Sequence, residues 1–419
     1  MTLLRLAALS LSNRRLTAGL TVLAIAVSVA LLLGVEKVRH GARASFANTI
    51  AGTDLIVGAR GGDVQLLLYS VFRIGNATAN ISWQSVETIQ DRPEVAWTVP
   101  FSLGDSHRGY RVLGTTQDYF RHYRFRAGRN LAFAEGEPFD DLFDAVVGAD
   151  VAAALGYRVG DPIVVDHGLG DSTFAQHDDK PFRVSGVLEK TGTPVDRTVH
   201  VSLAAIEAIH IDWRGGTRRA GMGVSADRLR AMDLQPGAVT ALLVGLKSRL
   251  SVFRLQRFVN EFREEALSAI LPGVALQQLW SLVGVAETAL TAVSAMVVLT
   301  ALIGMASMIL AALNERRREM AILRSVGARP STILGLLVIE SGLLSLIGAL
   351  IGLILTYGVN LALQPVLDRL FGLYLPIDPP TAREAAMLAA VVAAGFLVGL
   401  LPAWRAYRLS LADGMTVRT

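Results

Sequence analysis

The sequence contains no cysteine, and it has few charged residues for its length. Without cysteine, neither a disulfide nor a thiolate metal site can form; this absence is compatible with an oxidising compartment without proving one. Charged residues make up 18% of the 419 residues, whereas soluble domains carry about 25%. This shortfall predicts segments that cross a membrane. The net charge of +4 gives no reason to expect nucleic-acid binding, because the arginines cluster beside apolar segments.

Motifs for nucleotide binding and for hydrolysis are also missing from the sequence. It has no G-x-x-x-x-G-K-[ST] P-loop, no H-E-x-x-H and no G-x-S-x-G. The nearest string, LVGLKS at 243–248, lacks the glycine before the lysine and is typical of a strand end. We therefore predict no catalytic, cofactor-binding or metal residues and no enzyme activity in this chain. Any ATP and Mg²⁺ would be bound by a partner subunit.

Four windows lack charge almost entirely: 16–35, 288–313, 331–367, which only Glu340 interrupts, and 385–404. Each is long enough to cross a hydrocarbon core of about 30 Å at about 1.5 Å per residue. Buried core helices, the alternative, are usually shorter and amphipathic. For the first window we expect an uncleaved anchor rather than a signal peptide, because the charged GVEKVRHGARAS follows it without a small-residue cleavage site.

The arginines predict how these spans are oriented. They precede the first span, lie between the second and third, and follow the fourth: Arg5, Arg14, Arg15; Arg316, Arg317, Arg318, Arg324, Arg329; Arg405, Arg408, Arg418. Short positive segments stay in the cytoplasm, and all three groups fall on one side when four spans alternate. We therefore expect a multi-pass protein of the bacterial inner membrane with both termini in the cytoplasm.

The predicted fold class is a membrane α-helical protein with four transmembrane helices and an extracytoplasmic α/β domain inserted between helices 1 and 2. The expected segments are 1–15, an interfacial or cytoplasmic helix; 16–37, the first span; 38–284, the inserted domain; 285–313, the second span; 314–330, a cytoplasmic loop; 331–362, the third span; 363–382, a short outer loop; 383–404, the fourth span; and 405–419, a cytoplasmic tail. Leucines that alternate with polar residues before the first span favour a helix lying on the membrane surface.

Short apolar runs bounded by turn residues predict the strands of the inserted domain. They include 53–59, 95–103, 110–116 and 239–248, and the string at 144–165 predicts strand, short helix, turn and strand. The stretch 251–270 has helical spacing, with Phe253, Gln256, Val259, Phe262 and Ala266 near one face.

One polar stretch of the domain, at 165–179, could offer nitrogen and oxygen ligands to a divalent metal. Its candidates are Asp166, His167, Asp171, His177, Asp178 and Asp179. Because no histidine pair is spaced four apart, we instead predict a solvated hairpin tip without tight metal binding.

Two features of the third span indicate packing within the membrane. Glu340 is an intramembrane carboxylate, for which we predict structural pairing near the inner interface rather than a proton relay. Gly342, Gly348 and Gly352 lie three or four residues from other small residues, so neighbouring helices can approach closely. That face could pack within one chain or between two copies.

The order of one span, a large external domain and three further spans resembles the MacB/FtsX-like ABC transporter permeases. The block 314–360, which begins NERRREMAILRSVGARP, is close to the C-terminal pattern of that family, and so is LPAWRAYRLSLADGM at 401–415. The external strings AGRNL, VVGADVAAALGYRVGDPI and FRVSGVLEK are also similar to those of the family. The resemblance covers essentially the whole chain.

The resemblance implies a permease that is paired with a second permease copy, as a homodimer or as half-permeases, on a cytoplasmic ABC ATPase dimer. ATP-driven movement would be transmitted to the external domain for export or extraction of a lipoprotein, peptide or amphiphile, and a periplasmic or outer-membrane partner fits this scheme. By the same resemblance, the loop between the second and third spans is the coupling helix: Glu315, Arg316, Arg317, Arg318, Glu319, Met320, Ile322, Leu323, Arg324 and Gly327. Its arginines could alternatively be a topology signal alone.

The sequence leaves three other functions open. The chain could transmit ATP hydrolysis to a periplasmic cell-wall hydrolase without transporting anything. It could belong to a metal-linked transporter, or it could be a membrane-anchored sensor that has no ATPase. The residues themselves do not identify the substrate.

Overall fold

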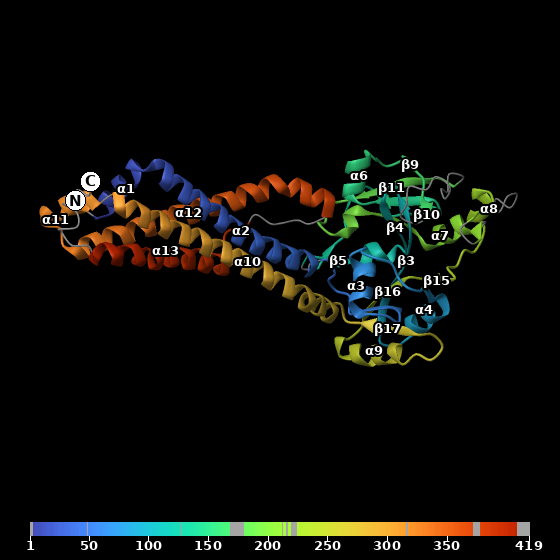
Figure 1. The fold of residues 1–419 in the computed structure, drawn as a ribbon. Helices are drawn as coiled ribbons and strands as arrows, with labels where there is room; N and C mark the ends of the chain where they lie inside the picture. The colour runs from blue at the N-terminus through green and yellow to red at the C-terminus, as the bar shows by residue number, and fades with distance from the viewer. Residues whose placement is uncertain are drawn as a thin grey trace. The chain divides into compact units, whose positions relative to one another are not determined.

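The computed structural model describes residues 3–47, 49–126, 128–167, 180–211, 213–214, 217–218, 224–315, 317–371 and 378–408 (Figure 1). The chain divides into two compact units. The bundle unit comprises residues 1–41, 284–365 and 375–419, and the domain unit comprises residues 42–283 and 366–374. Both units are described separately below.

Long apolar helices lie wholly or for most of their length in the bundle unit. They are α2 (Arg15–Ala47), α10 (Pro272–Glu315), α12 (Pro330–Phe371) and α13 (Ala382–Arg408), and two shorter helices, α1 (Leu3–Asn13) and α11 (Arg317–Ser325), accompany them. Within the described residues, four helices are long and apolar enough to cross a membrane. Side chains from all four form one buried cluster, to which Ile25, Leu302, Leu344 and Val391 belong.

These helices are longer than the charge-free windows. Helix α10 begins at Pro272, ahead of the predicted start at 285, and α12 runs to Phe371, past the predicted end at 362. Residues 363–371, predicted as the start of an outer loop, are therefore helical. Absence of charge marks only the part of a helix that suits lipid, whereas the hydrogen-bonded backbone can continue beyond it.

Helix α1 is separated from α2 by a turn at Arg14, so it is not a plain extension of the first span. Leu4 and Leu9 are 58% and 49% exposed, whereas Ala7 is fully buried. An exposed apolar side on a short helix beside a span fits the predicted position at the membrane surface.

The small residues of α12 pack within the chain. A Cβ on Gly342 would meet the ring of Phe396, and one on Gly348 would meet Ile25 at 2.7 Å. At Gly352 the carbonyl oxygen of Ala26 would lie at 2.7 Å. These three glycines therefore allow close packing among the helices of one chain. This is the first of the two alternatives, packing within one chain rather than between two copies.

The domain unit is built on a mixed sheet. In its described part the strand order is β17-β1-β16-β3-β4-β12-β8-β11-β7, while β10 pairs with β3 and β9 with β11. The strands are β1 (Leu55–Ala59), β3 (Val95–His107), β4 (Tyr110–Thr115), β7 (Phe133–Gly136), β8 (Asp144–Val147), β9 (Pro162–Ile163), β10 (Asp166–His167), β11 (Phe182–Leu188), β12 (Thr198–Ser202), β16 (Ala241–Leu246) and β17 (Leu267–Ile270). The apolar runs predicted as strands at 53–59, 95–103, 110–116 and 239–248 are confirmed as β1, β3, β4 and β16.

Helices cover this sheet, and short strand pairs complete the unit. The helices are α3 (Asp63–Val71), α4 (Trp83–Gln90), α5 (Asp118–His122), α6 (Ala149–Leu155), α7 (Leu203–His210), α8 (Ala226–Arg230) and α9 (Val252–Asn260). The pairs are β2 (Ile81–Ser82) with β15 (Ala238–Val239), β5 (Arg124–Phe125) with β6 (Arg129–Asn130), and β13 (Trp213–Arg214) with β14 (Thr217–Arg218). The α/β class predicted for the inserted domain is therefore confirmed.

The helix predicted over 251–270 was too long. Helix α9 ends at Asn260, and residues 267–270 form β17, which pairs antiparallel with β1. The Asn260 side chain accepts a hydrogen bond from the Ala269 backbone nitrogen at 2.8 Å, and this contact links the helix end to the strand. Pairing with a strand distant in the sequence has therefore overridden the local helical spacing.

Candidate functional site

Helix α11 is the centre of the predicted coupling region. It lies between α10 and α12 in the chain and is a separate short helix. Gly327 ends it with φ of +100°, a left-handed conformation that favours glycine. The Ala328 nitrogen donates to the Leu323 carbonyl at 3.0 Å, and Pro330 begins α12. The helix break at Gly327 and the start of the next helix at Pro330 thus have local backbone causes.

The described side chains of α11 and of the turn after it divide into two groups. Met320 and Ala321 are buried, and Met320 belongs to the apolar cluster of the bundle. Ile322, Leu323 and Val326 are 55%, 36% and 83% exposed. Helix α11 is therefore anchored to the bundle by one side and presents apolar side chains on another. We call Ile322, Leu323 and Val326 the exposed patch.

The structure describes less of the remaining predicted coupling residues. Arg324 is half-buried and Glu315 ends α10. Arg316 lies outside the described residues, as do the side chains of Glu315, Arg317, Arg318 and Glu319. Their part in coupling stays a prediction.

Glu340 is buried at 5% exposure, and its Oε1 accepts a hydrogen bond from the Ser10 hydroxyl at 3.1 Å. Ser10 is on α1, so the intramembrane carboxylate joins the N-terminal helix to α12. This contact supports the predicted structural pairing. A buried carboxylate that accepts such a bond also restrains α1.

A second polar site in the bundle was missed by sequence reasoning. We call Glu36, Lys37, Arg39, Glu287, Arg383 and Glu384 the charge cluster. Glu36 pairs with Arg383 at 3.3 Å and with Arg39 at 3.5 Å. Arg39 also reaches Glu287 at 3.6 Å. Helices α2, α10 and α13 are thereby held together by alternating charges.

Lys37 occupies the most enclosed part of the charge cluster. Its Nζ lies 3.5 Å from Glu384, donates to the Asp378 carbonyl at 3.1 Å, and sits 4.9 Å from the centre of the Tyr357 ring. The side chains of Lys37 and Glu384 are only 10% and 3% exposed. A buried ammonium with a carboxylate, a carbonyl and an aromatic face is well compensated, and losing one partner would be costly. Charges of both signs at span ends were the available sequence signal, but they did not indicate the pairing.

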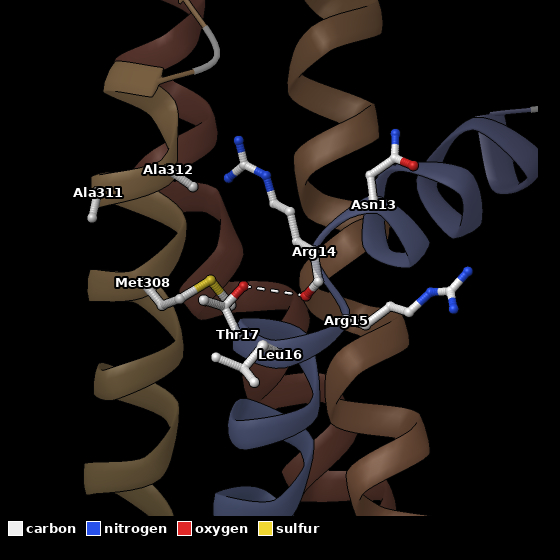
Figure 2. A pocket seen from close by; sticks show the side chains of 8 residues that line it. All are labelled: Asn13, Arg14, Arg15, Leu16, Thr17, Met308, Ala311 and Ala312. Carbon is white, nitrogen blue, oxygen red and sulfur yellow. Dashed lines mark hydrogen bonds between the residues drawn. The ribbon is translucent and has the colours of Figure 1, made fainter.

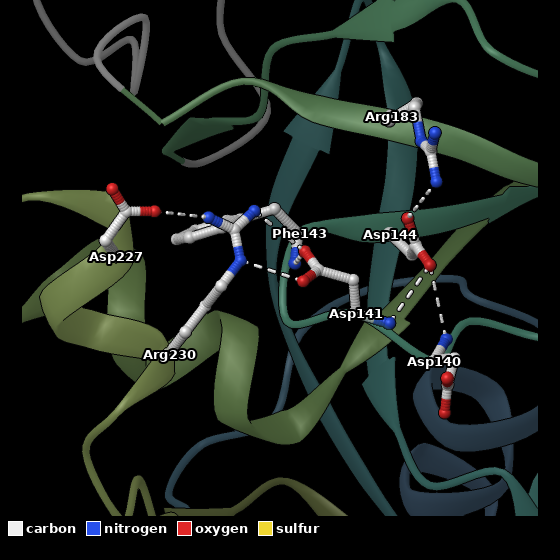
Figure 3. Close-up of polar contacts among 7 residues, drawn as sticks. All are labelled: Asp140, Asp141, Phe143, Asp144, Arg183, Asp227 and Arg230. Carbon is white, nitrogen blue, oxygen red and sulfur yellow. Dashed lines mark hydrogen bonds and ion pairs between the residues drawn. The ribbon is translucent and has the colours of Figure 1, made fainter.

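The domain unit holds a more open polar cluster between α8 and the start of β8 (Figure 3). Arg230 donates to both carboxylate oxygens of Asp141, at 2.8 and 3.0 Å, and to Asp227 at 3.2 Å. The bond from Arg230 holds the pKa of Asp141 below its usual range. Asp144 accepts from the backbone nitrogens of Asp140 and Asp141. These carboxylates therefore hold a loop and a helix together, which is a structural role.

The described histidines of the domain have structural partners. His107 contacts the Val164 carbonyl at 2.6 Å and the Tyr157 hydroxyl at 2.9 Å. His200 is fully buried, and burial lowers its pKa to about 3. The base of the 165–179 stretch is strand β10, paired with Ser106 and Asp105 of β3. Residues 168–179 lie outside the described part of the chain, so the metal-free hairpin tip stays a prediction.

Comparison with known families agrees with this arrangement. A model described as MacB-like periplasmic core domain matches residues 18–241, and one described as FtsX-like permease C-terminal matches residues 291–411. The chain therefore belongs to the MacB/FtsX-like ABC permeases, a family of multi-pass membrane proteins.

Among curated relatives, the chain is 25% identical over 416 residues to the macrolide export ATP-binding/permease protein MacB of Nitrobacter winogradskyi, covering 95% of this chain and 57% of the relative. It is 23% identical to the pyoverdine export ATP-binding/permease protein PvdT of Pseudomonas savastanoi pv. phaseolicola, covering 80% of this chain and 48% of that protein. The chain thus spans less than two thirds of the length of these relatives. The periplasmic region of MacB from Actinobacillus actinomycetemcomitans aligns with 55% of this chain and 94% of that structure, with 11% identity and a TM-score of 0.34.

Proposed function

We propose that this chain is the permease subunit of an ABC transporter of the bacterial inner membrane, driven by a separate cytoplasmic ATPase dimer. The exposed patch on α11 carries the proposal. Apolar side chains of this size at the end of a membrane bundle are suited to burial against another protein. ATP binding and hydrolysis on the partner would move α11, and the continuous helices α10 and α12 would transmit that movement along the bundle.

The work done would be export or extraction of a substrate by movement of the domain unit. The matched relatives are named for export of a macrolide and of pyoverdine, which supports a lipoprotein, peptide or amphiphile as cargo here. A second permease copy completes the scheme, since an ATPase dimer offers two equivalent docking surfaces. A periplasmic or outer-membrane partner would receive the cargo.

The experiment is an ATPase measurement on the co-purified complex in lipid nanodiscs. The double variant Ile322→Asp/Val326→Asp places two carboxylates in the docking surface, and we expect loss of the ATPase subunit or at least about a tenfold fall in stimulated ATP turnover, because a buried apolar anchor contributes about 2 kcal/mol or more. The control Ile322→Val/Val326→Ile keeps the patch apolar and should behave like the parent. Unchanged assembly and turnover in the Asp variant would contradict docking at α11.

The orientation in this proposal, with α11 and both termini in the cytoplasm, has its own test. The cysteine-free sequence allows single reporter cysteines. Leu250 is 93% exposed and therefore suits a reporter in the domain. In intact spheroplasts a membrane-impermeant thiol reagent should label Leu250→Cys but leave Ser325→Cys unlabelled until lysis. Labelling of Ser325→Cys in sealed cells would reverse the orientation.

A further inference from the structure

Two pockets, one in the bundle and one in the domain unit, differ in how their hydroxyl groups are satisfied. The bundle pocket lies at the turn between α1 and α2 and contains Thr17, whose hydroxyl donates to the Arg14 carbonyl at 3.2 Å (Figure 2). That hydroxyl has no further hydrogen to donate. The domain pocket lies beside the loop that joins α3 to β2 and contains Tyr69, whose hydroxyl has no hydrogen-bond partner among the described residues.

The domain pocket has a volume of about 290 Å³. Ligand pockets span about 300–1,000 Å³, so this volume suits a small ligand. The described residues that line it come from α3, from the loop after α3, and from strands β3 and β4: Tyr69, Gly75, Asn76, Ala77, Asn80, Leu103, Gly104 and Arg111. Polar side chains from separate parts of the domain unit therefore meet at one place.

Arg111 on β4 holds the loop beside the pocket. Its Nη1 donates to Asn76 Oδ1 at 2.9 Å, and its Nη2 donates to the Gly75 carbonyl at 2.9 Å. A guanidinium carries five N–H groups, so these two bonds leave others for a ligand. Burial and the positive charge of Arg73 lower the pKa of Arg111. An anion bound at Arg111 would offset both effects.

The two asparagines of the pocket already use their side-chain oxygens. Asn76 Oδ1 accepts from Arg111, and Asn80 Oδ1 accepts from the Thr240 hydroxyl at 3.3 Å. Neither NH₂ group has a hydrogen-bond partner within the part of the chain that the structure describes. Both asparagines therefore have donors, rather than acceptors, left for a ligand.

Tyr69 adds a buried donor to this set. The residue is only 5% exposed, and burial raises its pKa to about 12. The hydroxyl therefore stays protonated at neutral pH and can donate a hydrogen bond. Because buried polar groups are nearly always hydrogen-bonded, a hydroxyl without a protein partner at a pocket wall points to an acceptor on a ligand.

We propose that this pocket binds the carboxylate group of a small organic ligand. Arg111 would pair with the charge, and the Tyr69 hydroxyl and the Asn80 amide would donate to the oxygens. The two coplanar oxygens of a carboxylate match the planar N–H groups of a guanidinium. Leu103 and Ala77 provide apolar wall for the rest of the ligand. The inference concerns the domain unit alone and is independent of the proposed ATPase.

Isothermal titration calorimetry on the full chain in detergent at neutral pH tests this inference. The probes are acetyl-alanyl-alanine and its C-terminal amide, which are similar in shape, and only the first carries a carboxylate. We expect the acid to bind with a Kd at least about tenfold lower than that of the amide. Equal binding of the two, or binding of neither, would overturn the proposal. Inorganic phosphate that binds more tightly than the acid would make this a phosphate site and would equally overturn it.

Tyr69→Phe is the sharpest variant, because it removes a hydroxyl that has no hydrogen-bond partner among the described residues. The thermal unfolding temperature should not fall, whereas the Kd of the acid should rise at least about tenfold. The control Tyr110→Phe makes the same change on β4 at a residue outside the pocket lining and should bind like the parent. Unchanged acid binding by Tyr69→Phe would contradict the proposal.

Arg111→Gln tests the charge. It should remove the preference for the acid over the amide, whereas Arg249→Gln, at a side chain that is 89% exposed and outside the pocket lining, should keep that preference. A preference that survives in a folded Arg111→Gln variant would contradict the proposal. If Arg111→Gln unfolds because the loop is released, Tyr69→Phe decides the question by itself.

Discussion

The ion pairs of the bundle and those of the domain unit differ in their exposure to water. In the bundle, Lys37 and Glu384 are almost fully enclosed, and the charge cluster links three helices. In the domain, the Arg230 and Asp141 side chains are 42% and 40% exposed. Both are ion pairs between a carboxylate and a basic side chain, but only the pair in the bundle is protected from water. The difference indicates that the bundle depends on its charges at this point, whereas the domain depends mainly on its sheet core.

Breaking the enclosed pair should have the largest effect. Glu384→Gln leaves the Lys37 ammonium buried without its carboxylate, so we expect a loss of about 3–5 kcal/mol in the free energy of unfolding. The matched double variant Lys37→Met/Glu384→Leu removes both charges and should recover most of the loss. Thermal unfolding in detergent measures both. A Glu384→Gln variant as stable as the parent would remove the contrast between the two units.

Helix packing in the bundle should rank next. Gly352→Ala brings a Cβ to 2.7 Å from the Ala26 carbonyl oxygen, so the backbone must shift. Overpacking of this kind costs about 1–3 kcal/mol. Gly358 has no atom within 4 Å of its would-be Cβ, and Gly358→Ala should stabilise the helix by about 0.5–1 kcal/mol. The same unfolding assay compares them, and equal effects at the two positions would contradict close packing at Gly352.

In the domain, the largest electrostatic effect should come from a buried neutral side chain. The pKa of His200 is about 3 in the fold, against about 6.5 in an unfolded chain. Between these values the unfolded state binds a proton that the folded state does not, so stability falls with decreasing pH, by up to about 1.4 kcal/mol per pH unit. His200→Gln should flatten the dependence of the unfolding free energy on pH between about 6 and 4.

His210 should change the pH dependence of the unfolding free energy in the opposite direction, so it serves as a control. Burial alone would lower its pKa, but the hydrogen bond and the charge of Asp105 raise it. Its contribution is therefore present below the unfolded pKa of about 6.5 and is lost as pH rises through the folded value. His210→Gln should remove a component that weakens with rising pH. If both variants changed the slope in the same direction, this account of the domain's histidines would be wrong.

The exposed pair of the domain should give the smallest effect. Arg230→Ala breaks the contact with Asp141, and for side chains this open to water we expect a loss of about 0–1 kcal/mol. Because Arg230 lowers the pKa of Asp141, this small contribution is lost as pH falls below about 3.9 toward the folded value. Urea unfolding of the full chain at pH 7 and at acidic pH checks both points. A loss comparable to that of Glu384→Gln would erase the distinction drawn above.

The spans and several strands were predictable from the sequence because each depends on local composition. Charge-free windows mark the four long helices, and apolar runs between turn residues mark β1, β3, β4 and β16. The breaks at Gly327 and Pro330 follow from local backbone preferences. Strand β17 was missed because its pairing with β1 is non-local. The charge cluster depends on which helices are neighbours, and no spacing within one helix encodes that.

The exposed patch was only partly predictable. Ile322 and Leu323 were expected in the coupling region together with the buried Met320, but their separation into an anchoring and an exposed group depends on how α11 packs. Val326, the most exposed of the three, was not singled out. A residue just past the end of a short helix can be exposed or buried, and helical spacing does not decide between the two.

Docking of the exposed patch on a cytoplasmic ATPase is the central claim, and photo-cross-linking tests it most directly. Val326→Cys and Leu346→Cys, 83% and 43% exposed in the parent, would each carry a thiol-linked benzophenone in the assembled complex. We predict that the probe at 326 cross-links to the ATPase and that the probe at 346, within the third span, does not. An intact complex in which the probe at 326 never reaches the ATPase would contradict the account.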